Sequence, residues 1–149
     1  VGQTGRGWGA WGGQEGCLQR IIYDGNTKSG EIYSVKANQK GLEVILTNAI
    51  DNKVSKEQLI DSIKVSSWFY TNTGRYGSPE HDKREDKVED VFISEDRKSI
   101  VVSFVGFDKS QKWTDRVYLL GVNESEKIFG NIPSKQSLTA FYTLRSVPE

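Results

Sequence analysis

Residues 88–107 read VEDVFISEDRKSIVVSFVGF, and this stretch decides the fold. Two runs rich in valine, isoleucine and phenylalanine flank residues 95–98, EDRK, whose composition is that of a hairpin turn. In the second run, apolar side chains occupy both alternating faces between residues 100 and 105. Successive side chains of a strand point to opposite faces, so this run predicts a central strand covered on both sides.

The same alternation recurs along the rest of the chain. It predicts further strands at residues 17–23, 31–37, 41–48, 63–70, 112–122 and 138–147. One short helix is expected within residues 52–62, where Ser55 and Gln58 have the spacing of a capping box. Seven or eight short strands predict an all-β fold, an immunoglobulin-like or fibronectin-like antiparallel β-sandwich with at most one short helix. A small β-barrel is the alternative.

The composition excludes several classes of protein. The 149 residues carry 20 basic and 20 acidic side chains, and this balance argues against a nucleic-acid partner. The longest strong apolar cluster, residues 100–105, is far shorter than the roughly 20 residues of a membrane-spanning helix, so no membrane partner is expected. The single cysteine, Cys17, excludes an internal disulfide and is expected to be a small buried hydrophobe.

The N-terminal segment differs from the rest. Residues 1–16 hold seven of the fifteen glycines together with Trp8 and Trp11, without helical or strand periodicity. We therefore divide the chain into a Gly/Trp-rich arm or junction at residues 1–26 and a β-sandwich domain at residues 27–149. The start at Val1, without a signal-peptide pattern, indicates a processed product or an excised piece.

Recognisable catalytic chemistry is missing, so we expect the chain not to be an enzyme. His81 is the only histidine, no nucleophile motif accompanies it, and zinc lacks enough soft ligands. Residues 71–87 predict a long charged loop, functional or disordered. The acids and bases of residues 81–90 interleave and indicate a self-compensating charge run. We expect no cofactor, with a structural calcium ion as the alternative.

The candidate site is a group of aromatic and polar residues near the middle of the chain. Aromatic rings stack on the apolar faces of sugars, and nearby polar groups bond to hydroxyl or sulfate groups. A carbohydrate-binding surface is therefore the hypothesis, and the alternative is that Trp68 packs in the core or covers a sheet edge. The predicted ligand-binding residues are Trp68, Tyr70, Asn72, Arg75, Tyr76 and, as an extension, Trp113.

Three segments carry a family resemblance. Residues 7–26, 65–80 and 86–104, and above all the motif W-x-Y-x(5)-Y-G-S-P at residues 68–79, resemble the C-terminal β-sandwich of large secreted bacterial proteins. In those proteins a sorbosone-dehydrogenase-like propeller, and often a c-type cytochrome domain, share the chain. The resemblance implies that residues 1 to about 23 are the end of a propeller or its junction, and that redox chemistry belongs to domains absent from this sequence.

The residues and the resemblance together predict a non-catalytic carbohydrate-binding module of a secreted or cell-surface bacterial protein. Its expected partners are a polysaccharide and the catalytic domain of a parent chain. The competing hypothesis is a structural or docking domain, fastened to a partner through Trp8 and Trp11, that binds no glycan.

Overall fold

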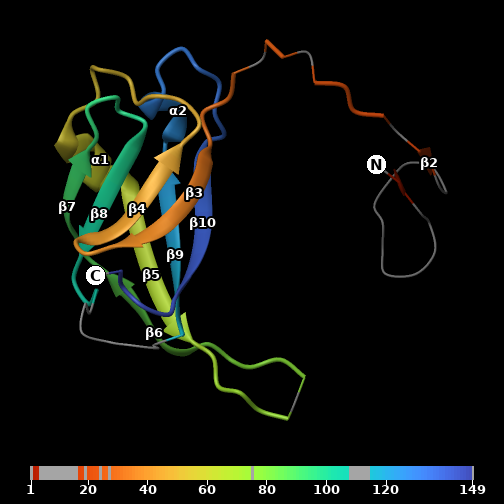
Figure 1. The fold of residues 1–149 in the computed structure, drawn as a ribbon, viewed down its shortest axis with the longest axis vertical. Helices are drawn as coiled ribbons and strands as arrows, with labels where there is room; N and C mark the ends of the chain where they lie inside the picture. The colour runs from red at the N-terminus through yellow and green to blue at the C-terminus, as the bar shows by residue number, and fades with distance from the viewer. Residues whose placement is uncertain are drawn as a thin grey trace.

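The protein is a sandwich of two four-stranded antiparallel sheets, as the computed structural model in Figure 1 shows. The structure describes residues 2–3, 17–18, 20–23, 25–26, 28–74, 76–107 and 115–148. One sheet has the strand order β10-β9-β5-β6 and the other β3-β4-β8-β7, while β1 and β2 form a separate two-stranded pair. The predicted all-β sandwich is confirmed.

The strands and helices follow one another in the order that the alternation predicts, with additions. Their bounds are β1 Gly2–Gln3, β2 Cys17–Leu18, β3 Ile32–Asn38, β4 Gly41–Leu46, α1 Lys56–Ser62, β5 Ile63–Phe69, β6 His81–Asp86, β7 Val88–Ile93, β8 Ser99–Phe104, β9 Arg116–Asn123, α2 Ser125–Ile128 and β10 Ser137–Leu144.

The strand order is that of an immunoglobulin fold. If β3 to β10 are lettered A, B, C, C′, D, E, F and G, one sheet reads A-B-E-D and the other G-F-C-C′. The chain changes sheets between β6 and β7 at a single residue, Lys87, whose carbonyl accepts a hydrogen bond from the Val105 amide at 2.9 Å. On the opposite edge, the Tyr142 hydroxyl accepts one from the Ala37 amide at 3.2 Å and joins β10 to β3.

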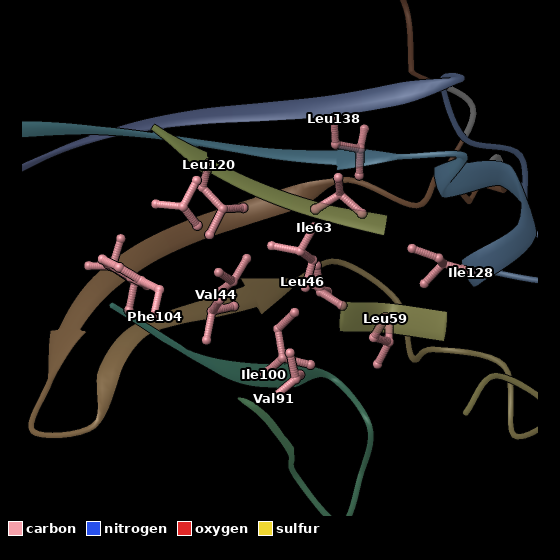
Figure 2. Close-up of a cluster of buried hydrophobic side chains, with 14 of the residues drawn as sticks. Val44, Leu46, Leu59, Ile63, Val91, Ile100, Phe104, Leu120, Ile128 and Leu138 are labelled. Atoms are coloured by element: carbon pink, nitrogen blue, oxygen red, sulfur yellow. The ribbon is translucent and has the colours of Figure 1, made fainter. Parts of the chain in front are cut away.

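The core lies between the sheets. Figure 2 shows side chains of both sheets meeting there, with Leu59 of α1 and Ile128 of α2 among them. β8 is a central strand, as predicted, and its Ile100, Val102 and Phe104 are all buried. Burial of this apolar surface supplies the main stabilisation of the fold. The expected cover on the other face of β8 is missing, because that face is the outer side of the sandwich: Val101 is only partly buried and Val105, just after the strand, is 51% exposed.

The predicted helix forms and begins as its sequence indicates. The Ser55 hydroxyl accepts a hydrogen bond from the Gln58 amide at 3.2 Å, and the Gln58 side chain accepts one from the Ser55 amide at 2.9 Å. This capping box satisfies two backbone donors at the helix start and is worth about 1 kcal/mol. α1 ends at Ser62 and β5 begins at the next residue, so the helix sets the start of the strand that carries Trp68.

The prediction of one long loop at residues 71–87 was wrong. Residues 81–86 form β6, which pairs with β5 through the register Val65↔Asp86, Ser66↔Glu85 and Ser67↔Arg84. Most side chains of β6 lie in solvent at the sheet edge, so a polar sequence suffices there. The short turn α2 was not predicted, and among the described residues of 17–23 strand is confined to Cys17–Leu18.

Two further features complete the description. No helix in the described part of the chain is long and apolar enough to cross a membrane. In Figure 1 the segment from residue 20 to β3 leads away from the sandwich to β2. Most of the Gly/Trp-rich arm, including Trp8 and Trp11, lies outside the described residues.

Candidate ligand-binding face

The candidate site centres on the outer face of the β10-β9-β5-β6 sheet, the face turned away from the second sheet. On β5, Ile63, Val65 and Ser67 are buried on the inner side, so Trp68 points outward, as its place in the alternation predicts. Trp68 pairs with Val117 of β9.

Trp68 is nevertheless covered by its neighbours. Its side chain is 3% exposed, and its ring makes edge-on contacts with Tyr70 and Phe141 at centroid distances of 6.4 and 6.3 Å. The Lys83 ammonium lies 5.2 Å from the centre of the indole. The structure therefore corrects one expectation: Trp68 offers no open ring face to a sugar and instead supports the rings around it.

The indole nitrogen of Trp68 is an anomaly. Nε1 is buried, and no hydrogen-bond acceptor for it occurs among the described residues. Burying an amide-like donor without a partner costs about 1–3 kcal/mol, and such groups are rare in folded proteins. Trp68 is thus tightly packed but incompletely satisfied.

Of the other predicted site residues, the structure describes Tyr70, Asn72 and Tyr76. Tyr70 is 48% exposed and touches Trp68, whereas Tyr76 is fully exposed and has no ring contact with the described aromatic residues. Asn72 is exposed in the same segment. Arg75 and Trp113 lie outside the described residues. Among the predicted residues that the structure describes, a ring contact joins Trp68 and Tyr70 and no others.

Phe141 belongs to this face and was missed by the sequence analysis. It is 67% exposed on the outer side of β10, where its neighbours Ala140 and Tyr142 face inward. The signal was present, because residues 138–144 alternate and place Phe141 with Thr139 and Thr143. Only the pairing of β10 with β9 shows that this ring reaches Trp68.

A shallow depression with both polar and apolar lining lies beside Phe141 on this face. Register pairs Phe141 with Leu119, Leu119 with Ser66, and Ser66 with Glu85, so one row crosses all four strands. The depression holds about 340 Å³, and its lining includes Lys64, Ser66, Glu85, Leu119, Gly121 and Asn123. An exposed ring beside hydroxyl, amide and carboxylate groups is the composition of a small-ligand site.

Beneath this face lies a buried polar network on the inner side of the same sheet. The Ser67 hydroxyl donates to Asp86 Oδ2 at 2.5 Å and accepts from Arg116 Nε at 3.0 Å. Arg84 Nε lies 3.1 Å from Asp86 Oδ1, and Arg116 Nη1 donates to Asp82 Oδ2 at 2.9 Å. These bonds tie β5, β6 and the start of β9 together.

The network also affects Tyr118, the neighbour of Ser67 on β9. Burial raises the pKa of the Tyr118 phenol, and the Asp86 carboxylate raises it further. Ser67 is fully buried, so a substrate cannot reach its hydroxyl in this structure. The network therefore links neighbouring strands of the sheet, and it does not present Ser67 as a nucleophile.

Several charges of residues 81–90 form ion pairs, but only Arg84–Asp86 lies within the run, and Asp90 pairs with Lys56 of α1. Lys83 pairs with Glu80 at 2.6 Å, and Arg84 and Arg116 take Asp86 and Asp82. Within the described ranges, no three histidine, cysteine, aspartate or glutamate side chains gather as metal ligands do. His81 stacks on Phe69 at a ring distance of 5.7 Å.

Comparison with models of protein families, with curated proteins and with solved structures finds no match. The resemblance to the C-terminal domain of sorbosone-dehydrogenase-like proteins therefore stays a prediction.

Proposed function

We propose that the chain is a non-catalytic carbohydrate-binding module, and that the outer face of the β10-β9-β5-β6 sheet holds the sugar. The observation that carries the proposal is the row from the exposed Phe141 ring through Ser66 to the Glu85 carboxylate. A pyranose needs both an apolar surface for its C–H face and polar groups for its hydroxyls.

The residues that stack on the sugar in this site differ from those that the sequence predicted. Phe141 and Tyr70 supply the exposed rings, and Trp68 holds them from below. Lys64, Ser66 and Glu85 supply polar contacts in the depression. Asn72 and Tyr76 extend the surface along the loop after β5. One stacked ring contributes on the order of 1 kcal/mol, so affinity is expected to be micromolar or weaker.

The function carries a location with it. Polysaccharides occur outside the cell, so a secreted or cell-surface bacterial protein is the context that we propose. The module then brings a catalytic domain of its parent chain close to the polymer and raises the domain's effective concentration there.

Replacing Phe141 with alanine is expected to weaken polysaccharide binding about five- to tenfold, the loss of one stacking contact. The measurement is affinity electrophoresis against neutral and sulfated polysaccharides, with and without calcium. Because Phe141 is 67% exposed, its replacement should leave the circular dichroism spectrum unchanged.

The matched control is Phe92→Ala. Phe92 is also an exposed ring on a strand, 40% exposed on β7, but it belongs to the other sheet and contacts Lys40 and Lys56. Its replacement should leave binding intact. Equal losses for the two variants would mean that the outer face of the β10-β9-β5-β6 sheet is not the site.

A second candidate function, a docking domain that binds no glycan, is favoured by the segment before β3. Leu18, Ile21, Ile22 and Tyr23 are 73–89% exposed within six residues. Exposed apolar clusters of this kind mark contacts with other proteins. Figure 1 shows this segment outside the sandwich.

Deleting residues 1–26 separates the two functions. If the chain is a carbohydrate-binding module, the shortened protein should retain its retardation by polysaccharide at unchanged strength. If it is a docking domain, the shortened protein should lose its association with the parent catalytic domain, measured by co-purification. Loss of polysaccharide retardation on deletion, with the sandwich still folded, would contradict the site proposed on the sheet.

A further inference from the structure

A second depression lies at the end of the sheet, between the two helices. It holds about 380 Å³, and its lining includes Gln58, Asp61 and Ser62 of α1 with Glu124 and Lys127 at α2. Amide, hydroxyl and carboxylate groups again face the same space. This second depression has no aromatic side chain in its lining.

The two depressions meet at Asn123. This residue ends β9 on the outer side of the sheet and lines both of them. Lys64 of β5 borders the first depression, and Ser62, the last residue of α1, borders the second. Lys64, Ser66 and Trp68 share one face of the strand and span about 13 Å at roughly 3.3 Å per residue. The two depressions therefore form one elongated surface, which runs from α1 to Phe141.

The charged side chains that line the two depressions carry no excess of cations, since two lysines stand against three carboxylates. Lys127 donates to Glu124 at 2.8 Å, and this ion pair raises the pKa of the Lys127 ammonium. The remaining charges are Asp61, Glu85 and Lys64. A sulfated or uronic-acid polymer requires an excess of cations, whereas neutral sugars bond to carboxylates and amides through their hydroxyls.

We infer that the ligand is a neutral polysaccharide, bound along a path from Asp61 past Asn123 to Phe141. This inference rests on the proposed function and adds the length and the charge class of the ligand. Phe141 stacks on one sugar near the end of the path, and Asp61 and Asn123 bond to hydroxyls of sugars farther along. A disaccharide covers only part of the path.

The test is titration calorimetry with oligosaccharides of two to six sugars from cellulose, xylan, mannan and laminarin, and with oligogalacturonates as the anionic comparison. Affinity for one of the neutral series is expected to rise about tenfold or more between the trisaccharide and the hexasaccharide. Asp61→Ala should remove most of that gain without weakening the trisaccharide. Glu126→Ala, an exposed carboxylate of α2 outside the depression, is the matched control and should change neither.

The outcomes separate the two proposals. Equal affinity for trisaccharide and hexasaccharide, with Phe141→Ala still weakening both, overturns the long path and leaves the carbohydrate module standing. Binding of the oligogalacturonates alone overturns the neutral class in the same way. If no oligosaccharide binds and Phe141→Ala behaves as the parent chain does, the proposed function fails and the path fails with it.

Discussion

Replacing Asp86 with alanine is expected to lower the free energy of unfolding by about 1.5–3 kcal/mol, because the buried Ser67 hydroxyl and the Arg84 guanidinium lose a charged hydrogen-bond partner. The Asp86 side chain is 3% exposed and lies beside the guanidinium of Arg84 and the hydroxyl of Ser67. Without its carboxylate, the Arg84 guanidinium loses this ion pair, while Arg116 keeps its bond to Asp82.

The measurement is the midpoint of guanidinium chloride unfolding at neutral pH. Asp86→Asn keeps the shape of the side chain and removes its charge, so it separates the electrostatic loss from the loss of packing. Glu80→Ala is the matched control, because its ion pair with Lys83 is exposed and is expected to contribute about 0–1 kcal/mol. If Asp86→Ala costs no more than Glu80→Ala, the network does not hold the sheet together.

The fold could be predicted from the sequence, but this polar network could not. Alternation at residues 99–104 identifies β8 because the strand is buried on its inner face and its residues are apolar there. β6 has the composition of a solvated loop, since all six of its residues, HDKRED, carry an ionisable side chain and none is apolar. Its only buried side chain is Asp86, stabilised by Arg84 and Ser67.

The candidate site, like the fold, could be predicted only in part. The alternation of β5 places Trp68 correctly on the outward side, since that depends on local strand geometry alone. Trp68 is buried because Phe141 and Lys83 cover it. Phe141 lies on β10, which is separated from β5 by β9, and Lys83 lies on β6, a strand that the sequence did not predict. Side-chain cover supplied by distant strands follows from sheet register, which a single sequence does not fix.

Replacing Trp68 with alanine is expected to cost about 3–5 kcal/mol of stability, as for other large buried aromatics. The variant removes a side chain that is 3% exposed and that contacts Tyr70 and Phe141. Polysaccharide binding should fall as well, because both exposed rings lose their support. The unfolding midpoint and the retardation by polysaccharide are measured on the same preparation.

Trp68→Phe decides what the indole does. It keeps a ring between Tyr70 and Phe141 and removes the buried Nε1–H that lacks a partner in the described structure, so its stability is expected within about 1 kcal/mol of the parent chain. If Trp68 only supports its neighbours, this variant binds polysaccharide as the parent does. If it folds equally well and loses binding, the indole N–H donates to the ligand once Lys83 or Tyr70 moves aside. Trp68 would then contact the sugar, as the sequence first predicted, through its edge and not through its face.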